Sequence, residues 1–88
     1  MKRADAIARA EERRPDYEIP KDWAMLKVDR RIIELVEGET QKVVDQLPAP
    51  GAPYDLVAWL ISFGEGPSYV ELAVDDHTGR IVRVRRSR

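Results

Sequence analysis

The hydrophobic pattern is clearest in the last third of the chain, where short apolar runs alternate with turn-forming clusters. The runs are rich in β-branched and aromatic side chains, and the clusters between them are Gly64-Glu-Gly-Pro-Ser68 and Asp75-Asp-His-Thr-Gly79. Runs of this length and composition, bounded in this way, are typical of strands. The pattern predicts an antiparallel meander over residues 55–86, with strands at 56–63, 69–74 and 80–86.

The three predicted strands differ in how they alternate. Residues 56–63 are apolar on both faces, which is typical of a central strand or one that is covered on two sides. The second strand alternates, so Val70, Leu72 and Val74 are expected to point inward. In the last strand we expect Val82 and Val84 inward and Arg83 and Arg85 outward. One covered face of the sheet fits this pattern.

The N-terminal region, residues 1–14, predicts a helix. Ala4, Ile7, Ala8 and Glu11 recur at helical spacing among strong helix formers. Pro15 ends the helix, because the residue before a proline avoids the helical conformation. Residues 15–21 are then expected to form a tether.

Residues 22–47 admit a helix or a hairpin. On a helical wheel the apolar residues of 22–37 gather on one side, Asp22 can cap the start and Gly38 can end the helix. Four β-branched residues and the turn-like Gly38-Glu-Thr40, followed by a return strand at 41–44, favour a hairpin instead. The periodicity extends over sixteen residues, and we therefore favour the helix for 22–37.

A proline-rich loop over residues 48–54 separates the two halves, since three prolines and a glycine exclude a regular element. The chain is thus predicted to be one α+β domain, with an N-terminal helix or two helices on a three- to four-stranded antiparallel sheet. The expected core joins residues of the helical half to residues of the meander: Ile7, Met25 and Leu35 against Trp59, Ile61, Leu72 and Val82.

Composition narrows the class of protein. The chain has 88 residues, 43% of them hydrophobic and none of them cysteine, so we expect one globular domain without disulfides or thiolate metal sites. The first residues lack the apolar core of a signal peptide, and no apolar run approaches the ~20 residues of a membrane span. These features predict a cytoplasmic protein that does not bind membranes.

Charge is unevenly distributed along the chain. Residues 15–79 carry five lysines and arginines against thirteen acidic residues, whereas residues 80–88 carry five arginines and no acid. Arginines on a last strand either protect an exposed sheet edge or provide an intermolecular contact, including a homodimer through that edge. Trp23 lies off the apolar stripe of its helix and is a second candidate for a partner contact. The candidate binding residues are Trp23, Tyr69, Arg80, Arg83, Arg85 and Arg86.

Part of the meander resembles the PepSY-type domain. The resemblance rests on Trp59-Leu-Ile-Ser-Phe63, Tyr69-Val-Glu-Leu-Ala-Val-Asp75 and Thr78-Gly-Arg-Ile-Val82, within residues 56–85. It implies a cystatin-like α+β fold with a helix on a small antiparallel sheet, and a role in binding or inhibiting partner proteins. Asp75 and Gly79 also suit any tight turn, through a capping carboxylate and a positive φ.

Catalytic chemistry is sparse in the sequence. His77 is the single histidine, and its neighbours in a tight turn are poorly placed to complete a metal site or a Ser-His-Asp arrangement. Gly64-Glu-Gly66 is too short for a phosphate-binding loop. We expect no enzyme activity, no cofactor and no metal.

The sequence therefore predicts a noncatalytic module that binds a protein or peptide, by adding a strand at the edge formed by Arg83, Arg85 and Arg86. Two alternatives stay open: an immunity- or inhibitor-type protein, and nucleic-acid binding through the C-terminal arginines. The isoelectric point near 5.8 argues against nucleic acid.

Overall fold

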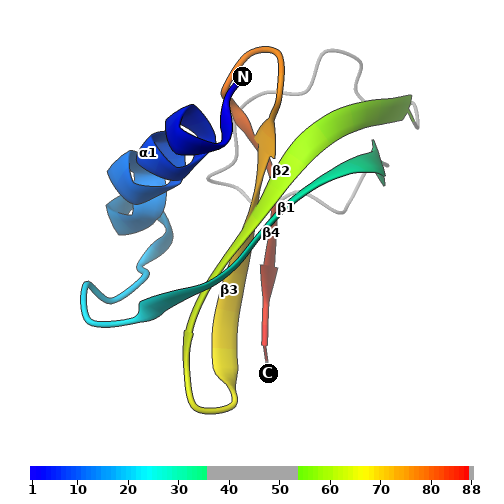
Figure 1. The fold of residues 1–88 in the computed structure, drawn as a ribbon. Coiled ribbons are helices and arrows are strands. Elements are labelled where there is room, and N and C mark those ends of the chain that lie inside the picture. The colour runs from blue at the N-terminus through cyan, green and yellow to red at the C-terminus, as the bar shows by residue number, and fades with distance from the viewer. Residues whose placement is uncertain (36–53, 88) are drawn as a thin grey trace.

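The computed structural model describes residues 1–35 and 54–87 of the chain. The elements in chain order are α1 (Arg3–Arg13), the short 3-10 helix η1 (Arg14–Tyr17), β1 (Ala24–Leu35), β2 (Tyr54–Glu65), β3 (Ser68–Asp75) and β4 (Ile81–Arg86). The strands form one antiparallel sheet in the order β1-β2-β3-β4, and α1 lies on one face of it (Figure 1). This confirms the predicted α+β class and the C-terminal meander.

The favoured helix over residues 22–37 is wrong, because β1 occupies Ala24–Leu35 and pairs with β2 along its whole length. A β-bulge between Met25 and Lys27 explains the misleading periodicity. Met25 opposes Phe63 and Val28 opposes Ile61, so two residues three apart share one face, as they would on a helix. The proposed return strand at 41–44 and most of the proline-rich loop lie outside the described residues.

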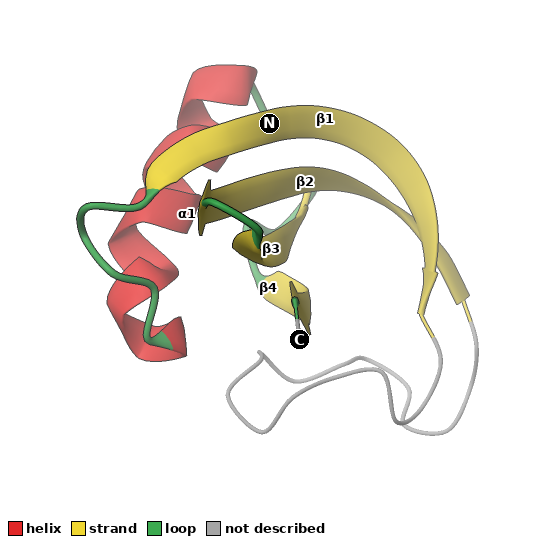
Figure 2. Cartoon of the chain, turned by 90° about the horizontal axis from the view of Figure 1, so that it is seen from below, coloured by secondary structure: helices red, strands yellow, loops and turns green. Residues whose placement is uncertain are grey.

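β1 and β2 are longer than β3 and β4. β1 pairs with β2 up to Leu35 and Tyr54, whereas β3 begins to pair with β2 only at Ala58. The ends of β1 and β2 therefore run past β3 and β4, and they curl away from α1 (Figure 2). β1 and β4 are the two edge strands.

The helix contacts the sheet through small side chains. Ala6 and Ala10 are fully buried, whereas Ala4, Ala8 and Glu11 of the expected stripe are exposed and Ile7 is half-buried. The buried face of α1 therefore differs from the predicted face. The tether follows α1 and buries Tyr17 and Ile19. These residues complete the helix-side cluster, which also contains Ile61, Phe63, Val70, Leu72, Val74, Ile81 and Val84.

The opposite face of the sheet carries the far-side cluster, which comprises Ile33, Ala58, Leu60, Ala73 and Val82. β2 contributes to both clusters, as its two apolar faces predict. Val82 was expected to share a face with Val84, and this is wrong. Val74 pairs with Ile81 and Ala73 with Arg83, so Val82 is the extra residue of a bulge and joins the far side.

None of the described helices is long and apolar enough to cross a membrane.

Candidate protein-binding surface

The predicted binding residues do not form one surface. Trp23 is half-buried against the helix-side cluster, and its carbonyl accepts a hydrogen bond of 2.8 Å from Arg14 Nη2. The indole therefore packs against the core of its own chain, next to the buried tether residues Tyr17 and Ile19 of that cluster.

The C-terminal arginines point in different directions. Arg83 is only 6% exposed and lies 3.6 Å from the carboxylate of Glu71. Arg86 donates a hydrogen bond to the carbonyl of Tyr17 on the helix side. Arg80 is exposed just before β4, and Arg85 is exposed on the far side, opposite Glu71. Arg83 lies on the face opposite to Val84, as the alternation predicts, but it is buried there, so the strand presents no continuous row of exposed cations.

Tyr69 and Leu26 form an exposed apolar pair at the start of β1 and β3. Tyr69 is 44% exposed and Leu26 is 58% exposed. Both lie next to Gly64: a Cβ atom on Gly64 would lie 2.6 Å from Leu26 Cδ1 and 3.2 Å from Tyr69 Cβ. It would also lie 2.5 Å from the Ser68 carbonyl oxygen, so only glycine fits here and the two side chains approach one another over its backbone.

Two cationic side chains flank this apolar pair on the far side of the sheet. Lys27 on β1 opposes Ser62, which in turn opposes Glu71, and Glu71 opposes Arg85 on β4. This cross-strand row directly adjoins the row of Gly64 and Tyr69. The Lys27 side chain is 55% exposed and lies 3.1 Å from Asp29. Within the described residues, Arg85 makes no ion pair.

Together, Leu26, Lys27, Tyr69 and Arg85 are called the Leu26–Tyr69 patch. Sequence reasoning identified Tyr69 and Arg85 but missed Leu26 and Lys27, which it placed on a helix. The only local signal was a glycine, Gly64, at the end of an otherwise apolar run.

The turn between β3 and β4 has the structural role that its residues predict. The Asp75 carboxylate accepts hydrogen bonds from the His77 backbone N–H at 3.1 Å and from the Thr78 hydroxyl at 2.8 Å. Gly79 has φ +76°. The His77 side chain is exposed, and among the described residues no three histidine or acidic side chains group to hold a metal ion.

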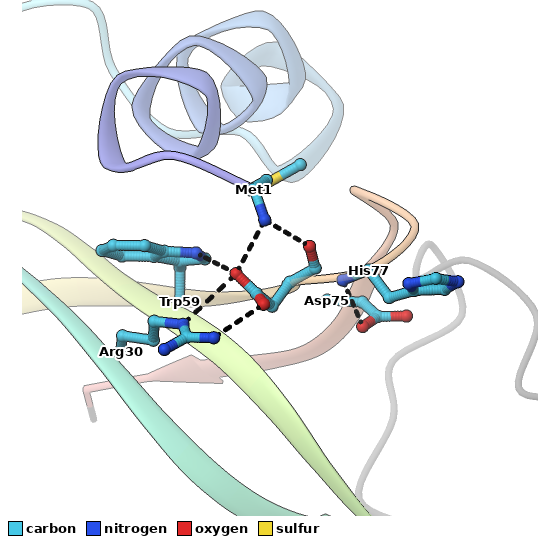
Figure 3. A network of polar contacts seen from close by, with 6 residues as sticks. Met1, Arg30, Trp59, Asp75 and His77 are labelled. Carbon is cyan, nitrogen blue, oxygen red and sulfur yellow. Dashed lines mark hydrogen bonds and ion pairs between the residues drawn. The ribbon is translucent and has the colours of Figure 1, made fainter.

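The Asp76 carboxylate joins Met1, Arg30 and Trp59 in one polar network, and these three partners are labelled in Figure 3. Its Oδ2 accepts a hydrogen bond from Arg30 Nη2 at 3.0 Å, and its Oδ1 accepts one from Trp59 Nε1 at 2.8 Å. The α-amino group of Met1 lies 3.0 Å from Oδ1. Arg30, with help from the amino group and Trp59, holds the pKa of Asp76 well below its usual range.

This network fastens the β3–β4 turn to β1 and β2. Asp76 also donates its backbone N–H to the carbonyl of Val57 at 3.0 Å. Both carboxylate oxygens are occupied by donors of the same chain, and a carboxylate with lowered pKa is a weak base. The arrangement is that of a structural clasp.

No family model matches the chain, and neither the curated proteins nor the solved structures include a significant match. The resemblance to PepSY-type domains therefore stays a prediction.

Proposed function

We propose that the protein is a noncatalytic binding module whose Leu26–Tyr69 patch holds an apolar segment of a partner protein that is flanked by acidic residues. The observation that carries the proposal is the pair of exposed large hydrophobic side chains, Leu26 and Tyr69, with Lys27 and Arg85 on the adjoining row.

The apolar pair supplies the binding energy in this proposal. A tyrosine ring offers a large contact area at low cost in conformational entropy, and its hydroxyl can still bond to polar groups of a partner. Covering Tyr69 and Leu26 together removes apolar surface from water, which favours association. Gly64 keeps the floor of the patch flat, because no side chain can project there.

The cations supply orientation and selectivity. Lys27 and Arg85 lie on the outer strands of the sheet, one at each end of the same cross-strand row. Acidic residues on both sides of an apolar partner residue would meet one cation each. Such complementarity raises the association rate and disfavours basic partners.

The patch is also rigid. Leu26, Lys27, Tyr69 and Arg85 all belong to strands of one hydrogen-bonded sheet. The backbone N–H of Tyr69 is further held by the Ser87 hydroxyl at 2.9 Å. Preorganisation lowers the entropic cost of binding, which suits recognition of an extended segment.

The predicted addition of a strand at β4 is replaced in this proposal by contact with the sheet face. Arg83 and Arg86, two of the three arginines expected to give specificity at that edge, contact Glu71 and Tyr17 of their own chain. The resemblance of residues 56–85 to PepSY-type domains implies the same class of function, the binding or inhibition of partner proteins. An immunity- or inhibitor-type protein would be one form of it.

The test is a binding measurement with defined peptides. The probe is a fluorescent peptide with a Leu-Phe centre flanked by aspartates, compared with the same peptide flanked by lysines. We expect the aspartate-flanked peptide to bind saturably and the lysine-flanked peptide not to bind. Replacement of Tyr69 and Leu26 by serine should weaken binding at least about tenfold. Arg85→Glu should also weaken binding, and its effect should be larger at low salt than at high salt.

Ile32→Ser is the matched control, because Ile32 is an exposed apolar residue of β1 that lies outside the patch. Equal loss of binding in Ile32→Ser and in the patch variants would contradict the proposal. So would the absence of binding to the acidic peptide together with salt-sensitive binding of a mixed-sequence oligonucleotide, which would favour the nucleic-acid alternative.

A further inference from the structure

We propose that the protein self-associates through β1, which pairs antiparallel with β1 of a second copy so that Ile32 lies on the two-fold axis. This interface is distinct from the Leu26–Tyr69 patch and does not depend on the function proposed for it.

β1 offers the longer of the two sheet edges. It has twelve residues and pairs with β2 on one side, whereas β4, the other edge, has six. Among residues 1–35 and 54–87, no strand pairs with the outer side of β1. The backbone groups along an open edge are a template for another strand, and a two-fold axis lets two identical edges satisfy one another.

Ile32 marks the centre of the proposed contact. It is 73% exposed, more than any other large hydrophobic residue in the described part of the chain. On β2, Ile32 opposes Val57, which is half-buried. Pairing at Ile32 would join the two copies through one apolar row, in which Val57 and Ile32 of one copy continue into Ile32 and Val57 of the other.

Charge favours this register. With Ile32 on the axis, residues two positions away on the same face oppose one another, so Arg30 of each copy meets Glu34 of the other. Registers centred on Asp29, Arg30 or Arg31 place identical charges directly opposite. A register centred on Val28 runs into the bulge between Met25 and Lys27.

Arg30 has capacity for a second acceptor. It bonds Asp76 through Nη2 at 3.0 Å and through Nε at 3.4 Å, and its Nη1 bonds none of the described residues. Its side chain is 55% exposed. Glu34 of the second copy would therefore extend the Asp76 clasp across the interface.

The β4 edge lacks this complementarity. Its residues 81–86 include three arginines and no acidic residue, so self-pairing of β4 cannot form an ion pair. The homodimer that the sequence suggested at the C-terminal strand is thus better placed at β1. The paired segment, residues 29–35, is short, and the dimer is expected to form and dissociate with concentration.

Light scattering coupled to size-exclusion chromatography across protein concentration tests the association. The wild-type mass should rise from that of one chain toward that of two, and Ile32→Lys should remain a monomer at every concentration. Leu26→Lys is the matched control on the same strand, because Leu26 is 58% exposed and lies outside the paired segment. Leu26→Lys should dimerise like the wild type but lose peptide binding. Ile32→Lys should stay monomeric but keep peptide binding.

A cysteine pair tests the register, since the chain has no cysteine of its own. Opposed residues on antiparallel strands lie about 4.5–5.5 Å apart between Cα atoms, within the range of a disulfide. Ile32→Cys should therefore give a covalent dimer on mild oxidation. Glu34→Cys, on the same face, should not, because the two copies of residue 34 would be offset by four residues, about 13 Å.

A wild type that stays monomeric at all concentrations would overturn the proposal, as would an Ile32→Lys variant that dimerises normally. Crosslinking at residue 34 as readily as at residue 32 would overturn the register. The circular dichroism spectrum of each variant should match that of the wild type, because the three replaced side chains, Leu26, Ile32 and Glu34, are all exposed.

Discussion

Arg14 lies where the end of α1, the tether and the sheet meet. It is 8% exposed, its Nη2 donates to the carbonyls of Pro20 and Trp23, and its Nη1 donates to Glu11 at 2.9 Å. The guanidinium also stacks 4.4 Å from the centre of the Phe63 ring. A planar group with several fixed donors can serve these partners at once.

Arg14→Ala should lower the free energy of unfolding by about 2–3 kcal/mol, because it leaves two tether carbonyls without their donor and removes the contact with Phe63. Chemical denaturation measures the change. Arg3→Ala, at an exposed arginine at the start of α1, is the control and should change stability by less than about 0.5 kcal/mol. A similar loss in both variants would show that Arg14 does not act through the tether.

Asp76 should make stability depend on acid pH. Its pKa is lowered in the folded protein, so the ionised carboxylate stabilises the fold above the ordinary aspartate pKa of about 3.9, and this contribution is lost as the pH falls below that value. Asp76→Asn should lower the melting temperature at pH 7 and the difference should shrink toward pH 2. Asp22→Asn, at an exposed aspartate, is the control. A pH-independent difference would refute the role of the charge.

At the scale of elements, α1 can pack closely on the sheet because the side chains on its buried face are small. Ala6 and Ala10 are each fully buried, so the helix backbone lies close to the strands. Ala10→Leu should therefore destabilise the protein by about 1–3 kcal/mol through overpacking. Ala8→Leu, on the exposed face, should be nearly neutral. Thermal melts compare the two, and equal effects would contradict close packing at Ala10.

β1 shows how an element can be misread from its sequence. Its β-branched residues indicated a strand, but Met25 and Val28 lie three apart and gave a helical period. The bulge that places both on one face exists only because the strand pairs with β2. Periodicity alone cannot distinguish a bulged strand from a short amphipathic helix, because both put residues three apart on one side.

At the scale of the whole molecule, one sheet joins two apolar clusters on opposite faces. β2 contributes Ile61 and Phe63 to the helix side, and Ala58 and Leu60 to the far side. Because both clusters depend on the same strand, neither is expected to persist without the other. The protein should therefore unfold in a single cooperative transition.

Leu60→Ala tests this cooperativity from the far side. Loss of a 9% exposed leucine should cost about 2–5 kcal/mol. Tryptophan fluorescence reports the helix side, through Trp23 and Trp59, and far-ultraviolet circular dichroism reports the backbone. Both denaturation curves should shift together to lower denaturant. Separate midpoints would show that the two clusters unfold independently.

The sequence by itself determined the N-terminal helix, the three-strand meander and the capped turn at Asp75. Each of these follows from local preference: helix formers before Pro15, β-branched runs between turn clusters, and a carboxylate and glycine at fixed offsets. The two-sided character of β2 was also readable, because its apolar residues occupy both faces.

Only the tertiary structure decided the state of residues 24–35, the burial of Arg83 and the meeting of Leu26 with Tyr69. These depend on register and on two bulges, which set which side chains share a face. A shift of one residue reverses every side chain of a strand, and no local pattern reports it. The candidate surfaces of this protein therefore arise from strand pairing, since their residues are far apart in the chain and meet only across the sheet.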